Sequence, residues 1–224
     1  MTYDELIGAL MREGTLAADA VRDLPEAEFG LPSRCQPWDV KALMAHLWRD
    51  VDRVAEFLDG PTPSEVDGDL ITYWRVYDPK AEGPLISART YEVADRFGTG
   101  ADLVRSFQEH LAMAAEMAAG LDPSRPIRTR LQTMRLDDFI KTRVLELAVH
   151  GLDLARALNR DPWLTPDGAR VTIEILEGLM DIPLPPELGW DDVTFIETGT
   201  GRRPLQESER EVLGARAERF PLIG

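Results

Sequence analysis

Apolar residues recur at helical spacing over most of the first 180 positions of the chain. This pattern predicts five long helices, over residues 3–22, 40–58, 102–119, 136–158 and 166–180. Asp39 stands at the N-cap position of the second helix, and Gly120 and Asn159 follow the third and fourth, where helices commonly end. Because most links between these helices are short, the pattern predicts a mainly α protein built on an antiparallel bundle.

One long segment, residues 60–100, breaks this pattern. Prolines and glycines divide it into short pieces, with a short helix expected near residues 87–97 and an aromatic cluster at Tyr73, Trp74 and Tyr77. A connection of this length inside a compact domain is often functional, so we expect a lid or the wall of a pocket. The alternative is that the aromatic rings only anchor the loop to the core.

The residues after the fifth helix differ in character from the bundle. Three prolines follow residue 182, then come a strand-like VTFIE at residues 193–197, a turn at 198–201 and an acidic helix near 206–219. Residues 1–180 are therefore expected to form the helical bundle. Residues 181–224 are expected to form a short C-terminal extension, with one or two strands and a helix, packed on that bundle. A polar, arginine-rich loop is expected at residues 121–135.

A polar stripe runs along the otherwise apolar helix whose residues 142–158 read TRVLELAVHGLDLARAL. Glu146 and His150 stand four residues apart, so they share one face of this helix, and Arg143 and Asp153 extend the stripe. A helix that is apolar nearly all round is normally buried. A buried carboxylate and imidazole need a charged partner or a cation. The spacing of Glu146 and His150 alone is consistent with two interpretations, an internal ion pair and a metal site.

Composition narrows the classes of partner. The chain has 224 residues and a formal net charge of -15, which argues against binding to nucleic acid or to anionic membrane surfaces. It has no apolar run long enough to span a membrane, and its N-terminus lacks the apolar region of a signal peptide. The single cysteine, Cys35, excludes an internal disulfide and fits the cytoplasm. A small-molecule substrate or a protein partner remains, for a monomer or a homodimer.

Two passages resemble a known family. SRCQPWDVKALMAHLWRDVDRV, residues 33–54, carries a Cys-x-x-Trp element that leads into a helix with Ala-His-Leu, and residues 143–158 carry an Arg-x-x-Glu-x-x-x-His-Gly-x-Asp-Leu-Ala element. Both resemble signatures of the mycothiol-dependent maleylpyruvate isomerase family, part of the DinB-like superfamily. The resemblance covers roughly residues 3–180. It implies a DinB-like antiparallel four-helix bundle.

The resemblance also implies a metal site. In the family a divalent metal, typically zinc, is held by residues that correspond here to His46, Glu146 and His150. Three nitrogen and oxygen ligands with an open fourth position are typical of catalytic rather than structural zinc. Arg143 and Asp153 are then candidate catalytic residues that orient an imidazole or the carboxylate.

Two other residues compete for a place in this site. His110, the one remaining histidine, is better interpreted as a partly buried histidine than as a ligand, because the family pattern has no ligand there. Cys35 is better interpreted as a small buried hydrophobe than as a fourth ligand, which would close the site.

The activity implied by the resemblance is metal-dependent thiol chemistry. The metal would activate a thiol cofactor, mycothiol, for transfer to a small electrophile or for its isomerisation. Arg75, Arg89 and Arg143 are candidates for binding a carboxylate. Two alternatives remain, a metal-dependent hydrolase and a non-catalytic metal-binding bundle. The sequence does not name the substrate.

Overall fold

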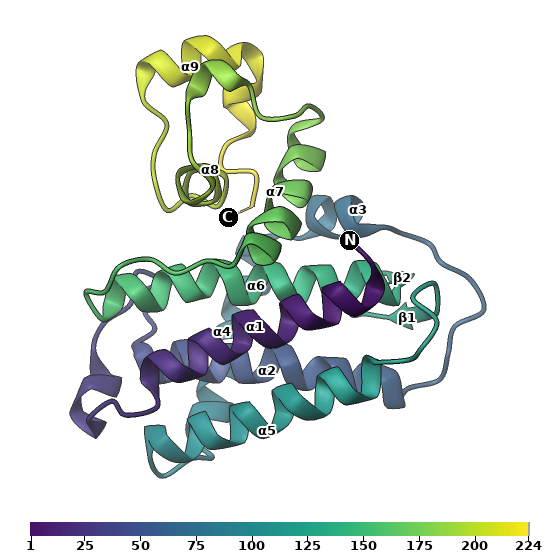
Figure 1. Cartoon of the computed structure of the whole chain (residues 1–224), viewed down its shortest axis with the longest axis vertical. Coiled ribbons are helices and arrows are strands. Elements are labelled where there is room, and N and C mark those ends of the chain that lie inside the picture. Colours follow the sequence, from purple (N-terminus) through teal and green to yellow (C-terminus); the bar gives the residue numbers. More distant parts are fainter. Residues whose placement is uncertain (224) are drawn as a thin grey trace.

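Four long helices form the body of the protein in a computed structural model that describes residues 1–223 (Figure 1). They are α1 (Tyr3–Val21), α2 (Val40–Asp59), α5 (Gly100–Ala118) and α6 (Leu136–Ala157). Three of them begin at a side-chain cap, because Thr2, Asp39 and Thr99 accept hydrogen bonds from backbone N–H groups of the first turn. The long helices predicted from apolar spacing are confirmed, with ends that differ by at most two residues.

The four helices form a closed ring in cross-section. α1 packs against α5 and α6, and α2 packs against the same two helices from the other side. Leu10, Leu43, Phe107 and Val144, one from each helix, are fully buried at the centre. Burial of a side chain of this size contributes about 1.5–3 kcal/mol. The mainly α, four-helix bundle predicted from the sequence is confirmed.

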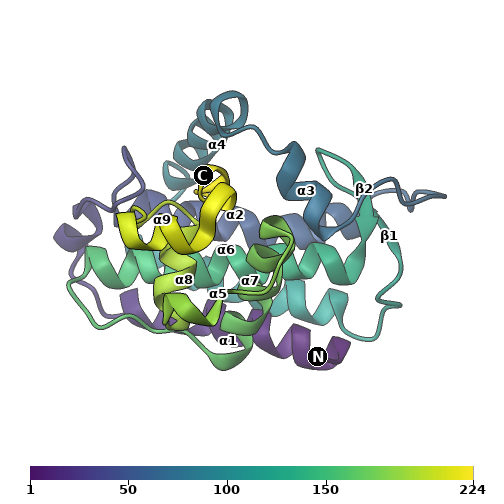
Figure 2. The same cartoon turned by 90° about the horizontal axis from the view of Figure 1, so that it is seen from above.

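The segment between α2 and α5 carries two further helices, α3 (Leu70–Val76) and α4 (Pro79–Ala94). Figure 2 shows both on the side of the bundle away from α1. The helix predicted at residues 87–97 overlaps α4, which starts earlier because Asp78 caps it and Pro79 suits its first turn, and which ends at Ala94. α4 packs on α2, so the segment forms a wall beside the bundle.

The predicted polar loop at residues 121–135 contains a short hairpin. Its strands are β1 (Pro126–Arg128) and β2 (Thr133–Arg135), which pair antiparallel with Ile127 opposite Met134. Both of these side chains are buried, whereas Arg128 and Arg135 face solvent. A strand of three residues is too short for an alternation of apolar and polar positions to be recognised in the sequence.

After the bundle come α7 (Pro166–Met180), α8 (Asp192–Gly199), α9 (Glu207–Leu213) and the short 3-10 segments η2 (Pro186–Leu188) and η3 (Gly214–Arg219). Figure 1 shows α8 beside α7, with α9 further away from the bundle. The acidic helix predicted near residues 206–219 corresponds to α9 and η3. Within the described part of the chain, no helix has the length and apolar character that crossing a membrane requires.

The prediction of a strand at residues 193–197 is wrong, because these residues lie in helix α8. The run Val-Thr-Phe-Ile is rich in residues that favour strands. However, the Asp191 carboxylate accepts a hydrogen bond from the Thr194 N–H and so caps the start of a helix. This helix buries Phe195 and Ile196 on one side. The cap and the tertiary packing outweigh the local strand preference.

Candidate metal centre

Two antiparallel helices bring the candidate ligands together. His46 lies on α2, and Glu146 and His150 lie one turn apart on α6. The Nε2 atom of His46 is 3.5 Å from Glu146 Oε2, and the Nε2 atom of His150 is 3.3 Å from the same oxygen. The two imidazole rings meet edge to face, with centroids 4.8 Å apart. One atom from each of the three residues lies within 4.8 Å of the others, so the arrangement can surround a single cation.

The donor set fits a divalent metal such as zinc. His150 Nδ1 lies 2.8 Å from the buried carboxylate of Asp153, which can hold a ring proton on that nitrogen and leave Nε2 for a cation. Nε2 faces the Glu146 carboxylate, so a positive charge, either a proton on Nε2 or a metal ion, is needed between the two groups. Burial by itself raises the pKa of Glu146, but hydrogen bonds and charge from His150 and His46 hold it well below its ordinary value.

Asp153 is the hub of a buried charge network next to the ligands. Its side chain is fully buried and accepts hydrogen bonds from Arg202 at 2.6 and 2.8 Å and from Arg34 at 2.7 Å. The Cys35 thiol donates to it at 3.0 Å. Burial would raise the pKa of Asp153, but His150 and Arg202 outweigh burial and lower it strongly. An ionised carboxylate therefore supports His150, as expected for the partner of a metal ligand.

A second buried carboxylate, Asp50, stands beside the other histidine. Asp50 Oδ2 lies 3.1 Å from His46 Nε2, and Asp50 Oδ1 accepts a hydrogen bond from Arg143 at 2.5 Å. The Arg143 side chain is almost completely buried and lies over the Phe139 ring. Arg143 therefore contacts the histidine side of the cluster through Asp50. Asp50 follows His46 by four residues on α2, which repeats the spacing of Glu146 and His150 on α6.

Arg34 and Arg202 are the functional candidates that sequence reasoning missed. Arg202 comes from the turn after α8, and Arg34 from the loop before α2. Arg34 also pairs with Glu197 on α8 at 2.7 Å, so the network ties the C-terminal extension to the candidate ligands. No spacing rule links residues so far apart along the chain, and only the tertiary fold brings them to Asp153.

The two competing residues have separate outcomes. His110 lies on α5 against the Trp48 ring, with centroids 4.4 Å apart, and its Nδ1 is 2.8 Å from the Ser106 carbonyl. This confirms the partly buried histidine expected outside the site. Cys35, expected to be a simple buried hydrophobe, is half-buried and lines the same cavity as the three candidate ligands. That expectation needs correction, because the Cys35 thiol contacts Asp153 and Arg202.

A cavity of about 440 Å³ opens over the candidate ligands. His46, Glu146 and His150 contribute to its lining, and Tyr73, Trp74 and Tyr77 from α3 and its C-terminal end form part of its wall. The wall predicted from residues 60–100 is confirmed. Of the three arginines expected to meet a carboxylate, Arg143 lines this cavity, whereas Arg75 and Arg89 lie outside its lining.

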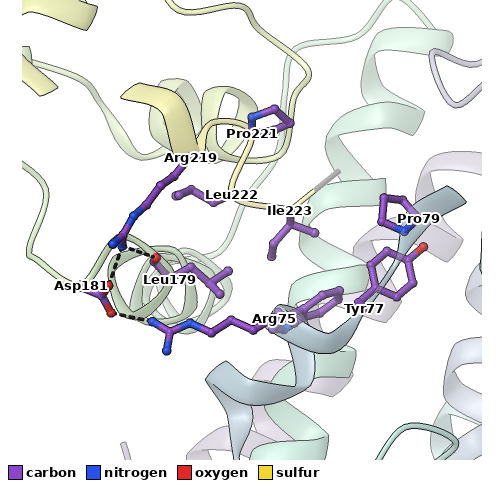
Figure 3. A pocket seen from close by; sticks show the side chains of 10 residues that line it. Arg75, Tyr77, Pro79, Leu179, Asp181, Arg219, Pro221, Leu222 and Ile223 are labelled. Atoms are coloured by element: carbon purple, nitrogen blue, oxygen red, sulfur yellow. Dashed lines mark hydrogen bonds and ion pairs between the residues drawn. The ribbon is translucent and has the colours of Figure 1, made fainter. Parts of the chain in front are cut away.

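A second cavity of about 610 Å³ lies next to the first and shares Trp74, Tyr77, Pro79 and Ile223 with it. Figure 3 shows Arg75 and Arg219 reaching Asp181 from opposite sides at its edge. Arg219 also donates to carbonyls at the end of α7. The two arginines therefore hold α3, the end of α7 and the C-terminal segment together.

The chain matches a known family over most of the bundle. Residues 10–155 match the model of the mycothiol maleylpyruvate isomerase N-terminal domain, and this range includes all three candidate ligands. The chain belongs to this family. The resemblance inferred from residues 33–54 and 143–158 is thereby confirmed. The match ends before the C-terminal extension, so Arg202 lies outside it.

A solved structure supports the same fold. The chain superposes on a crystal structure described as the mycothiol-dependent maleylpyruvate isomerase with a TM-score of 0.53. The alignment covers 80% of this chain and 70% of that chain, at 15% sequence identity. At this identity the likeness concerns the fold alone. Comparison with curated protein sequences gives no match.

Proposed function

We propose that the protein uses a divalent metal, typically zinc, to activate mycothiol for addition to a small electrophilic substrate. Membership of the mycothiol maleylpyruvate isomerase family makes it an enzyme of the isomerase or transferase kind. The observation that carries the proposal is the convergence of His46, Glu146 and His150 in the lining of a 440 Å³ cavity. Three ligands from the protein leave a position for a reactant, as in catalytic zinc sites.

When bound, the metal supplies a Lewis acid that lowers the pKa of a coordinating thiol and so makes a nucleophile available at neutral pH. The chain's own residues supply orientation. Asp153 fixes the tautomer of His150, and Arg202 and Arg34 keep Asp153 ionised. Arg143 holds Asp50 against His46. Asp153 and Arg143 are therefore proposed as positioning residues, which act on the reaction through the ligands.

The cavity walls support a reaction with a small molecule. Aromatic rings of Tyr73, Trp74 and Tyr77 cover the face opposite the helices and limit the access of water to the reacting atoms. After the sulfur adds to an electrophilic carbon, loss of the thiol gives a net isomerisation, whereas retention of the carbon–sulfur bond gives a transfer product. Both outcomes use the same site.

Calorimetry of zinc-loaded protein with mycothiol, followed by turnover on a panel of electrophiles, tests the proposal. We expect thiol binding and thiol-dependent turnover in the wild type and in His110→Ala, whose imidazole lies outside the site. We expect both to be lost in Glu146→Gln. Absence of thiol binding at millimolar concentration, together with ester or amide hydrolysis, would contradict the proposal and favour a hydrolase.

A further inference from the structure

The charged residues that line the ligand cavity separate into two ends. The antiparallel helices α2 and α6 form its floor, and His46, Asp50 and Arg53 follow one another along the same face of α2. His46 lies at the metal end, close to Glu146 and His150. Arg53 lies seven residues further along, which corresponds to about 10 Å of helix. Tyr73 and Arg53 both line the cavity. Burial raises the pKa of Tyr73, and the positive charge of the nearby Arg53 opposes this rise.

Four arginines and three carboxylates line this cavity, and the arginines differ in how well they are neutralised. Arg130 pairs with Glu82 at 2.7 Å, Arg202 with Asp153 at 2.6 Å and Arg143 with Asp50 at 2.5 Å. Each of these three arginines therefore has a carboxylate oxygen within hydrogen-bond distance. The lining is thus rich in positive charge, although the whole chain carries a net charge of -15.

Arg53 is the incompletely paired member of this group. Its nearest carboxylate oxygen is Asp50 Oδ1 at 3.6 Å, beyond hydrogen-bond distance, and that oxygen already accepts the bond from Arg143. Its Nε–H is buried without a hydrogen-bond partner in the described part of the chain. The side chain is only 12% exposed. Burial lowers the pKa of the Arg53 guanidinium more than the nearby Asp50 carboxylate raises it, and the charge of Arg143 lowers it further. A guanidinium nevertheless stays protonated at neutral pH, so this position holds a cation whose charge the surrounding side chains only partly compensate.

We infer that Arg53 is the anion subsite of this cavity and binds a carboxylate of the small-molecule substrate. The carboxylate would accept hydrogen bonds from the guanidinium in the two-pronged geometry that arginine favours. The reacting carbon of the substrate would then lie toward the metal end, one short carbon chain away from the carboxylate. This inference rests on the proposed function for the identity of the reaction, but the anion subsite itself needs neither metal nor thiol.

Binding of butyrate to metal-free protein tests the subsite, with neutral butyramide as the matched ligand control. We expect the wild type to bind butyrate at millimolar concentration, and to bind butyramide at least tenfold more weakly. Arg53→Gln should weaken butyrate binding by about 10- to 100-fold, the range for losing charge-assisted hydrogen bonds. Arg130→Gln, which removes a fully paired arginine from the same cavity, should change the affinity by less than about threefold.

Equal butyrate affinity in the wild type and Arg53→Gln would overturn the inference, as would failure of the wild type to bind butyrate at 20 mM. If Arg53→Gln does not fold, Arg53→Lys serves as the second variant, because lysine retains the charge but cannot donate two parallel hydrogen bonds as a guanidinium does. We expect Arg53→Lys to bind butyrate several-fold more weakly than the wild type does. Unchanged affinity in Arg53→Lys would then overturn the inference. Zinc and thiol binding are measured on the same proteins. Butyrate binding through Arg53 without any thiol binding in the wild type would support the subsite and contradict the proposed function.

Discussion

Asp153→Asn removes one negative charge from the centre of the buried network while it nearly preserves the shape of the side chain. The amide oxygen can still accept one hydrogen bond, and His150 Nδ1 is positioned to donate it. Arg34 keeps Glu197 at 2.7 Å as a partner. Arg202 has no such replacement, because its other hydrogen bonds go to the neutral Thr200 carbonyl and to the Cys35 sulfur. The variant therefore leaves Arg202 as a largely buried cation without a counterion.

The expected cost follows from this loss. Removing one partner of a buried ion pair typically costs about 3–5 kcal/mol. Because asparagine keeps one acceptor, we expect a decrease near the lower end, about 3 kcal/mol, in the free energy of unfolding. We also expect zinc affinity to fall by about 10- to 100-fold, since a residue that orients a metal ligand has been weakened. Urea unfolding at pH 7 and competitive zinc titration measure the two effects separately.

Asp181→Asn is the matched control. Asp181 also accepts from two arginines, Arg75 and Arg219, but its side chain is 51% exposed. Exposed ion pairs contribute about 0–1 kcal/mol, so the control should lose 1 kcal/mol or less and keep its zinc affinity. If Asp153→Asn and Asp181→Asn have equal and small effects on both measurements, the assignment of Asp153 as the hub of the site is wrong.

Two further predictions concern pH. The Glu13 carboxylate accepts a hydrogen bond from the Thr165 N–H at the start of α7, and burial raises the pKa of Glu13. The native state therefore favours the neutral acid. The wild type loses stability as the pH rises above 4.5, the ordinary pKa, toward the raised pKa that Glu13 has in the native state. Glu13→Gln should therefore gain in melting temperature relative to the wild type between pH 4 and pH 8, and a difference that does not vary with pH would contradict this reasoning. Hydrogen bonding from Arg203 lowers the pKa of Glu209 from 4.5 to about 2, so the stability that the ionised group contributes is complete above pH 4.5 and is lost as pH falls toward 2. The deficit of Glu209→Gln in urea unfolding should accordingly be larger at pH 6 than at pH 3, and an unchanged deficit would refute the role of the Arg203–Glu209 pair.

The helices of the bundle could be predicted from the sequence because their apolar spacing and caps agree with the tertiary packing. Thr2, Asp39 and Thr99 cap helices whose buried faces repeat every three or four residues. The same reasoning failed at residues 193–197, where strand-favouring residues lie in a helix that is fixed by a cap and by packing. A strand of three residues offers too few positions for alternation, so the hairpin at residues 126–135 could not be predicted either.

The candidate ligands could be predicted in part for a similar reason. Glu146 and His150 share a helix, so their spacing alone predicts that they lie side by side. His46 joins them through the packing of α2 on α6, which the family resemblance implied and helical periodicity did not. Arg202 and Arg34 reach Asp153 from separate segments, and no local pattern marks either one. Contacts of this kind depend on the tertiary fold.

The zinc content of purified protein tests the central claim most directly. The wild type and His110→Ala, after zinc loading and gel filtration, should each hold one equivalent of zinc per chain. His46→Ala and His150→Ala should hold less than about one tenth of an equivalent under the same conditions, because removal of one of three ligands destroys the site. Circular dichroism on the same samples shows whether the bundle is intact. Full retention of zinc by folded His46→Ala and His150→Ala would contradict the assignment of the metal centre.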